Sequence, residues 1–268
     1  MSFALYQVDA FAERLFEGNP AAVVPLDRWL DDGLMMRIAA ENNLAETAFF
    51  VAEGDGYRLR WFTPTVEVDL CGHATLAAAH VLFTWLGYDR PDIHFETRSG
   101  RLRVTRAADG LLAMDFPALP AGPVRAPGGF WAALKARPVD LFKSNNFLAV
   151  FDAAADIAAL APDFAALGKV LRPLNMCVIA TAPGDAGTGW DFVSRFFAPA
   201  HGVNEDAVTG SAHCTLVPYW AARLGKADLV ARQISTRGGT LYCTRAGERV
   251  ILRGRCADYL RGEIGVAS

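Results

Sequence analysis

The sequence predicts an α+β fold made of two similar half-chains, each a β-sheet with one apolar helix. Short stretches in which apolar and polar residues alternate, such as residues 3–10, indicate strands. Two long apolar stretches of helical character begin at Gly72 and at Gly210, 138 residues apart. Both stretches end in a Leu-Gly pair, and these pairs are again separated by 138 residues (87 to 225). This equal spacing is typical of an internal repeat.

Two further pairs of segments support the repeat. Residues 97–102 align with residues 236–241, and residues 61–64 align with residues 196–199. Because the three anchors follow the same order, we infer two homologous half-chains with approximate two-fold symmetry. Such symmetry brings equivalent loops face to face across a cleft.

The expected domain boundary lies in a segment rich in proline and glycine, residues 117–129. A chain of 268 residues suits two domains of ordinary size. We therefore expect one domain over residues 1–118, which the C-terminal segment can complete, and a second over residues 119–268. The active site is expected in the cleft between them.

The pattern of the first half predicts the elements that position the chemistry. A helix around residues 34–39 is expected to end at Asn42-Asn43, and the helix after Gly72 is expected to end at Leu86-Gly87. The expected strands are residues 3–10, 21–24, 45–51 and 57–62, with two more in 95–116 around the turn at 108–110. Glu46 therefore lies where a strand begins.

The composition favours a cytoplasmic protein that binds a small molecule. Lysine and arginine total 26 against 29 aspartates and glutamates, and no basic run argues for nucleic acid or an anionic membrane as partner. The apolar run 74–86 is shorter than the roughly 20 residues that a membrane span requires. The N-terminal residues lack signal-peptide features, and five cysteines without a Cys-x-x-Cys pair are typical of reduced thiols.

The two helix starts carry polar side chains where the backbone favours an anion. His73 can donate to a substrate oxygen or move a proton, or it can serve only to cap the helix. Asp206 can hold a substrate amino or hydroxyl group, or orient His73. Ser211 can donate to a substrate carboxylate. Capping is the alternative role for both Asp206 and Ser211.

Glu46 and Cys71 are the candidates for proton transfer. A carboxylate among apolar residues is expected to be partly desolvated, which raises its proton affinity; the alternative is an edge residue that points to solvent. Cys71 at a helix start suggests a thiolate, but its counterpart in the repeat is Thr209. A mechanism with two opposed thiols is therefore excluded, and a structural role for Cys71 fits the sequence as well as a reactive one.

The sequence indicates neither a cofactor nor a metal ion. Glycine-rich nucleotide-binding patterns are missing, and five scattered histidines show no metal-ligand spacing. His213 lies in the first turn of the second helix and fits either a site role or a packing role. The remaining histidines are expected to be packing or surface residues: His80, His94 and His201.

Six segments together resemble the phenazine-biosynthesis PhzF family, and they follow that family's order: residues 8–11, 18–24, 43–47, 62–64, 69–76 and 204–212. The resemblance implies the diaminopimelate-epimerase-like fold, in which each domain wraps a curved, barrel-like, mixed or mostly antiparallel sheet around a central helix. It also implies isomerisation without a cofactor, with Glu46 as the acid/base. The residues that would bind substrate are Gly72, His73, Asp206, Gly210 and Ser211.

We therefore predict an isomerase similar to trans-2,3-dihydro-3-hydroxyanthranilate isomerase, which moves a proton on a small carboxylate-bearing molecule. Two alternatives stay open. One is an amino-acid epimerase that uses Cys71 with a non-thiol partner, and the other is a catalytically silent metabolite-binding protein of the same fold. The resemblance is also the basis for expecting a homodimer, but it does not fix the substrate.

Overall fold

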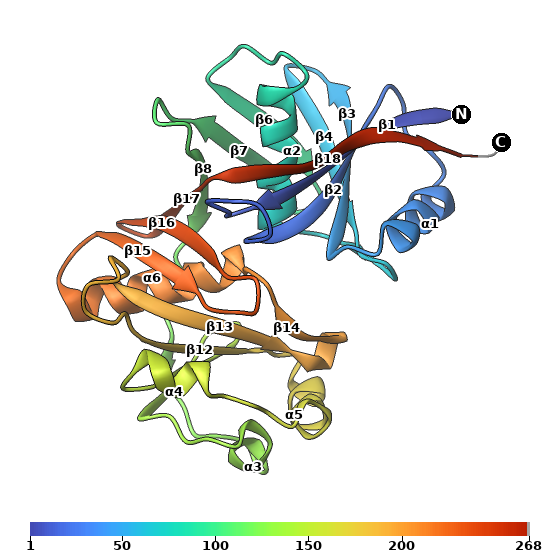
Figure 1. Cartoon of the computed structure of the whole chain (residues 1–268). Coiled ribbons are helices and arrows are strands. Elements are labelled where there is room, and N and C mark those ends of the chain that lie inside the picture. The colour runs from blue at the N-terminus through green and yellow to red at the C-terminus, as the bar shows by residue number, and fades with distance from the viewer. Residues whose placement is uncertain (267–268) are drawn as a thin grey trace. The chain divides into compact units, whose positions relative to one another are not determined.

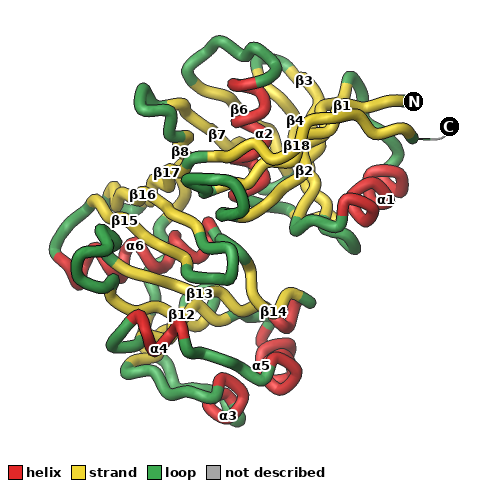
Figure 2. Tube along the Cα trace, viewed as in Figure 1, coloured by secondary structure: helices red, strands yellow, loops and turns green. Residues whose placement is uncertain are grey.

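The computed structural model describes residues 1–266, and the chain divides into two compact units. The first unit contains residues 1–115 and the C-terminal segment from Arg253, and the second contains Phe116–Leu252. Figures 1 and 2 show that strands dominate both units and that helices are few. The α+β fold class predicted from the sequence is confirmed.

The first unit is a mixed sheet that curves around helix α2 (Figure 1). Its elements are β1 (Ser2–Ala10), β2 (Asn19–Leu26), α1 (Asp32–Asn42), β3 (Glu46–Glu53), β4 (Gly56–Phe62), β5 (Glu67–Val68), α2 (Gly72–Thr84), β6 (Asp92–Thr97), β7 (Gly100–Arg106), β8 (Leu112–Pro117) and β18 (Cys256–Gly265). The strands pair in the order β18, β1, β2, β3, β4, β6, β7, β8, and β5 also pairs with β4. The β2–β3 and β4–β6 pairs are parallel and the others are antiparallel.

Helix α2 is the core helix of the first unit. Ten of its thirteen residues are buried, as expected for a helix that is apolar all round. The regular helix ends at Thr84, two residues before the predicted end. Gly87 has a left-handed φ of 69° in the turn that follows, and the amide of Tyr88 donates to the carbonyl of Leu82 at 3.0 Å. The glycine therefore closes this turn from outside the regular helix.

The second unit repeats the strand pairing of the first. Its elements are β9 (Gly122–Pro123), α3 (Phe130–Leu134), β10 (Asp140–Lys143), β11 (Phe147–Val150), α4 (Ala154–Ala158), α5 (Phe164–Leu171), η1 (Arg172–Leu174), β12 (Val178–Pro183), β13 (Phe192–Ala198), η2 (Pro199–His201), β14 (Val203–Asp206), α6 (Gly210–Leu224), β15 (Asp228–Gln233), β16 (Gly239–Ala246) and β17 (Arg249–Gly254). The β11–β12 and β13–β15 pairs are parallel, and β10–β11, β12–β13, β13–β14 and β15–β16 are antiparallel. The strands of the second unit therefore follow the order β10–β11–β12–β13–β15–β16, which matches the order β1–β2–β3–β4–β6–β7 of the first unit. Strand β14 occupies the place of β5.

Two equivalent ion pairs show the repeat at atomic detail. The Nε atom of Arg60 lies 2.7 Å from Oε1 of Glu67, and the Nε atom of Arg195 lies 2.7 Å from Oε1 of Glu205. Each guanidinium also lies over the phenylalanine ring two residues further along its strand, at 5.1 and 4.9 Å from the centroid. The internal repeat inferred from the sequence is therefore present in the structure of each unit.

The structure adds elements that the sequence analysis did not predict. Residues 92–117 form three strands rather than two, because β6 precedes β7 and β8. In the second unit, α3, α4 and α5 pack in one core cluster with Val178 and Ala180. Thr181 follows Ala180 in β12 and points to the opposite face of the strand, where it accepts a hydrogen bond from Trp220 of α6 at 2.9 Å, so α6 covers the other face of this sheet.

No helix in the part of the chain that the structure describes has the length and apolar character needed to cross a membrane.

Candidate active site

Glu46 is the first residue of β3, as the sequence predicted. Its neighbour in the sheet is Ala21 of the parallel strand β2, and the next four residues of β3 are buried. The Glu46 side chain is 17% exposed. Its carboxylate is therefore fixed at the open end of a buried strand rather than on a solvated edge.

Cys71 and His73 lie at the start of α2. Cys71 is the N-cap residue with extended backbone angles, and its side chain makes no capping hydrogen bond. Its carbonyl accepts a hydrogen bond from the hydroxyl of Thr75, one turn into the helix. Gly72 begins the helix, and a β-carbon there would meet only Met114, at 4.0 Å. The local fold therefore leaves the Cys71 and His73 side chains, each 6% exposed, to interact with Glu46.

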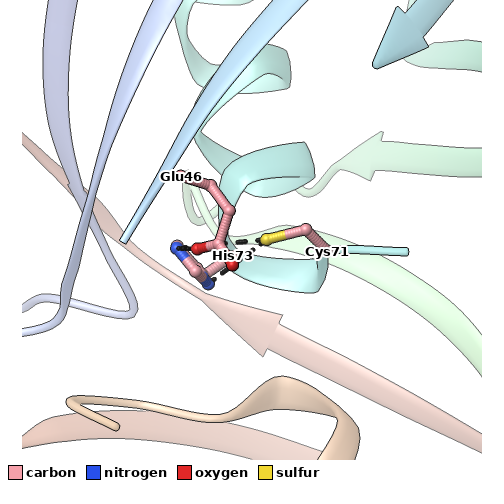
Figure 3. Close-up of side chains that lie close together, drawn as sticks. All are labelled: Glu46, Cys71 and His73. Atoms are coloured by element: carbon pink, nitrogen blue, oxygen red, sulfur yellow. Dashed lines mark hydrogen bonds and ion pairs between the residues drawn. The ribbon is translucent and has the colours of Figure 1, made fainter. Parts of the chain in front are cut away.

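The three side chains converge in one cluster, as Figure 3 shows. His73 Nε2 lies 3.0 Å from Glu46 Oε2. The Sγ atom of Cys71 lies 3.5 Å from His73 Nδ1 and 4.0 Å from Nε2. Glu46 Oε2 is buried and accepts no aligned hydrogen bond from the described residues, so it meets His73 as a charge contact.

Asn19 is a site residue that the sequence analysis did not single out. Its Nδ2 atom lies 3.3 Å from His73 Nδ1, and the residue is 1% exposed. In neutral His73, a hydrogen bond donated by Asn19 to Nδ1 places the ring proton on Nε2, which faces Glu46. The preceding Gly18 has a φ of 72°, and a β-carbon there would lie 2.3 Å from the Ala10 carbonyl oxygen. The Gly-Asn-Pro turn was the feature of the sequence from which Asn19 could have been predicted as a site residue.

The three groups of the cluster change each other's protonation. Burial raises the pKa of Glu46, but the positive charge of His73 and the polar side chains of His73 and Cys71 beside the carboxylate bring this pKa below its usual value. Burial lowers the pKa of His73, but the negative charges of Cys71 and Glu46 raise it well above the usual value. Burial, and then the Glu46 charge, raise the pKa of Cys71.

The expectation of a raised proton affinity for Glu46 is therefore wrong. Burial does act on Glu46 as predicted, but the nearby imidazolium reverses the net direction, which favours the carboxylate form. For Cys71, a reactive and a structural role fit the sequence equally well, and burial and the neighbouring carboxylate raise the thiol pKa, which disfavours the reactive thiolate. The directions of these shifts favour a carboxylate at Glu46 beside a protonated His73.

The second helix start is a hydrogen-bonded network in the second unit. Thr209 is the N-cap residue of α6, and its hydroxyl donates to Asp206 Oδ2 at 2.5 Å. Gln233 joins both residues: its Oε1 accepts from the Thr209 amide at 2.9 Å, and its Nε2 donates to the Asp206 carbonyl at 2.8 Å. Asp206 therefore accepts from the N-cap hydroxyl instead of capping the helix itself. Gln233, which is fully buried, was missed by the sequence analysis.

Gly210 and Ser211 begin α6, directly after this network. Gly210 is buried and Ser211 is exposed. Ser211 does not cap the helix, because the N-cap position belongs to Thr209 and no side chain makes the capping bond. The Ser211 hydroxyl is therefore accessible at the helix start where it was predicted to bind a carboxylate.

The other histidines hold structural positions. His213 is fully buried, its Nδ1 lies 2.9 Å from the Thr209 carbonyl, and burial lowers its pKa to about 4. His80 bonds Asp258 at 3.0 Å, and His94 lies 3.4 Å from Asp92. These contacts agree with the packing and surface roles expected from the sequence.

The two repeated units, each a mixed sheet with one buried apolar helix, define a protein of the diaminopimelate-epimerase-like class. A hydroxyproline epimerase from Agrobacterium vitis shares the fold, with a TM-score of 0.60 over 98% of this chain and 92% of that chain at 12% identity.

Comparison with sequences and structures identifies the family. The family model described as phenazine biosynthesis-like protein, PhzC-PhzF, matches residues 8–262. A Pseudomonas aeruginosa protein named an uncharacterized isomerase is 52% identical over 98% of this chain and 99% of its own length. The human phenazine biosynthesis-like domain-containing protein is 37% identical, with coverage of 98% and 99%. The crystal structure of a PhzF family protein from Enterococcus faecalis has a TM-score of 0.93 and 44% identity, with coverage of 99% and 100%. This chain belongs to the PhzC-PhzF family.

Proposed function

We propose that this protein is a cofactor-independent isomerase that moves a proton between carbon atoms of a small carboxylate-bearing molecule. Family membership and the isomerase name of the Pseudomonas relative support isomerase-like or epimerase-like chemistry. The observation that carries the proposal is the position of the Glu46 carboxylate. It lies at the start of α2, 3.0 Å from an imidazole nitrogen, with a buried oxygen that accepts no aligned hydrogen bond from the described residues.

In the proposed mechanism, the Glu46 carboxylate removes a proton from a substrate carbon, and the resulting carboxylic acid returns the proton at another carbon of the conjugated system. One C–H bond breaks and another forms, so the reaction needs no oxidant, reductant or co-reactant. Protonated His73 donates to the substrate oxygen on which negative charge develops. The first-turn amides of α2 favour the same charge.

Residues of the second unit complete the proposal. Asp206 and Ser211 are proposed to bind the substrate amino or hydroxyl group and the carboxylate, respectively. Gly210 begins α6, and we assign it to the site because the backbone amides at a helix start favour an anion. These three assignments follow from the family resemblance and from the exposed position of Ser211.

Epimerisation through Cys71 is the weaker proposal. The carboxylate beside Cys71 and the burial of its side chain both raise the thiol pKa, which disfavours the nucleophilic or basic thiolate. The equivalent position in the repeat carries Thr209, so a second thiol is missing from the sequence pattern. A silent binding protein would bind ligand without any exchange of carbon-bound protons, which the following experiment measures.

The test is incubation with trans-2,3-dihydro-3-hydroxyanthranilate in deuterium oxide, followed by NMR. We expect product formation and deuterium at a ring carbon, both lost in Glu46→Gln. Glu53→Gln is the matched control, because Glu53 ends the same strand and is half exposed beside Arg58. Turnover that survives in Glu46→Gln would contradict the assignment, and a wild type without exchange on this compound or on other small carboxylates would contradict the isomerase proposal.

The cellular compartment and the oligomeric state of the protein also stay proposals. All five cysteines are unpaired thiols, which supports a reducing compartment such as the cytoplasm. A homodimer is proposed on the family resemblance alone. Analytical ultracentrifugation of the purified chain would test it, and a mass of one chain at micromolar concentration would contradict it.

A further inference from the structure

The side chains of Glu46, Cys71 and His73 also form a set of metal-binding donors. One carboxylate oxygen, one sulfur and one imidazole nitrogen lie within 4.8 Å of one another. Proteins bind zinc through these three donor types, and a site with three protein ligands leaves a fourth position open. Within residues 1–266, this is the group of three such side chains that is close enough to hold an ion.

The spacing of the donor atoms fits a tetrahedral ion after small side-chain shifts. Zinc–nitrogen and zinc–oxygen bonds near 2.0 Å and a zinc–sulfur bond near 2.3 Å place neighbouring ligand atoms about 3.3–3.6 Å apart. His73 Nε2 lies 3.0 Å from Glu46 Oε2 and 4.0 Å from Cys71 Sγ, on either side of that range. The backbone fixes the three positions, because two begin α2 and the third begins β3.

The surroundings of the donors also favour a cation. Glu46 Oε2 is buried, receives no aligned hydrogen bond from the described residues, and lies 3.0 Å from His73 Nε2. The other nitrogen of His73 lies 3.3 Å from Nδ2 of Asn19, and a flip of this amide would place Oδ1 there to accept the Nδ1 proton of a metal-bound His73. A polar partner on the second ring nitrogen is the usual way in which proteins orient a metal-bound histidine.

The internal repeat limits this donor set to the first unit. The residues equivalent to Cys71 and His73 are Thr209 and Ser211, which replace a thiol and an imidazole with hydroxyl groups that bind zinc poorly. The scattered histidines of the sequence predict no metal site. That criterion misses a site built from three different residue types, one of which is distant in sequence.

We propose that Glu46, Cys71 and His73 bind one Zn²⁺ ion per chain, and that the bound ion inhibits the enzyme by occupying Glu46. Binding replaces the protons on the thiol and the imidazolium, which pass to solvent, and no oxidation or reduction is involved. The binding follows from the donor atoms alone. The inhibition rests on the proposed function of Glu46.

The binding test uses the full-length protein after treatment with a chelator and needs no substrate. Zinc affinity is measured by competition with a chromophoric chelator, and Co²⁺ is added separately as a spectroscopic probe. We expect one Zn²⁺ per chain, and a sulfur-to-cobalt charge-transfer band in the near ultraviolet. Binding well below one equivalent, or a cobalt complex without this band, would overturn the proposal.

Variants identify the ligands. Cys71→Ser should lose the charge-transfer band and weaken zinc binding by more than about tenfold, since even partners outside the coordination sphere contribute 10–100-fold. Glu46→Gln should keep the band and weaken zinc binding. Cys256→Ser is the matched control, because this thiol belongs to the same unit but contacts the Leu76 carbonyl. A band that persists in Cys71→Ser, or is lost in Cys256→Ser, would contradict the assignment.

Inhibition is measured separately in the deuterium-exchange assay, with and without Zn²⁺. Loss of exchange with zinc, and its recovery on adding chelator, is expected in wild type. If zinc binds stoichiometrically but the metal-free protein exchanges no substrate proton, the metal site stands and the proposed function fails. If the metal-free protein is active and zinc neither binds nor inhibits, the metal proposal fails and the proposed function stands.

Discussion

The starts of α2 and α6 are equivalent in the repeat but differ in chemistry. Both begin at a glycine after an extended N-cap residue that makes no side-chain cap. Both N-cap carbonyls accept a side-chain hydrogen bond from one turn later: Thr75 donates to Cys71, and His213 donates to Thr209. The backbone geometry of the two helix starts is therefore the same, whereas the side chains around them differ.

The difference lies in what contacts each N-cap residue. At α2 an ionisable cluster forms, because Glu46 of β3 and His73 carry opposite charges at 3.0 Å. At α6 the amide of Gln233 and the hydroxyl of Thr209 satisfy the network, with Asp206 as acceptor. The duplicated helix start thus carries a cluster of ionisable side chains in one unit and a network of hydrogen bonds in the other. The following changes test this contrast, from the largest expected effect to the smallest.

The largest effect on turnover is expected when the residues at the start of α2 are replaced by those at the start of α6. The double variant Cys71→Thr/His73→Ser should lose about 10²-fold or more in turnover, since a positioned acid/base partner contributes 10²–10⁴-fold. The pKa of Glu46 should also rise, because burial then acts without the His73 charge. The acid limb of the pH–rate profile should therefore move to higher pH. His80→Ser, on the same helix, is the control, and an unchanged profile in the double variant would refute the coupling.

Removing the side-chain amide of Gln233 at the start of α6 should mainly lower the free energy of unfolding. Gln233→Met leaves the Thr209 amide and the Asp206 carbonyl without their partner, at about 1–3 kcal/mol each, so we expect a loss of about 3 kcal/mol in the free energy of unfolding. Urea titration measures it. Gln7→Met, at a half-buried strand position, is the control. A loss below about 1 kcal/mol would show that this network is not what fixes the helix start.

His213 should make the second unit sensitive to acid. Its folded-state pKa of about 4 lies below the usual 6.5, so the unfolded chain binds the proton more tightly and stability falls as the pH drops from 6.5 towards 4. Between pH 7.5 and 5 this group should remove about 2 kcal/mol from the free energy of unfolding. His213→Thr introduces the residue of the first repeat and should remove this part of the pH dependence. Urea titrations at both pH values measure it, and an equal dependence in both proteins would contradict the assignment.

Ser211 should have the smallest effect on stability. Because the side chain is exposed, Ser211→Ala should change the free energy of unfolding by less than about 0.5 kcal/mol. Loss of one hydrogen bond to a charged carboxylate, about 1.5–3 kcal/mol, should raise KM by about tenfold or more. Steady-state kinetics on the substrate found in the exchange assay measures it. An unchanged KM would remove Ser211 from the substrate-binding residues.

The sequence by itself determined the features that depend on neighbouring residues and on the repeat. Glycines mark the two helix starts, an apolar run predicts α2, and a charged residue before an apolar run places Glu46 at the beginning of β3. The α+β class and the family resemblance also follow from the sequence, because periodicity and motif order survive without knowledge of distant contacts.

Only the tertiary structure decided which groups meet and how they ionise. The parallel pairing of β2 with β3 and the packing of α2 bring Glu46 to His73 and Asn19 to the same ring. In the second unit, β14 and β15 both pair with β13, and Gln233 thereby reaches Asp206. No local pattern encodes contacts over these separations. The direction of the Glu46 pKa shift depended on this as well. Burial and a neighbouring charge act in opposite directions, and their balance is set by a distance of 3.0 Å between residues 27 positions apart in sequence (46 and 73).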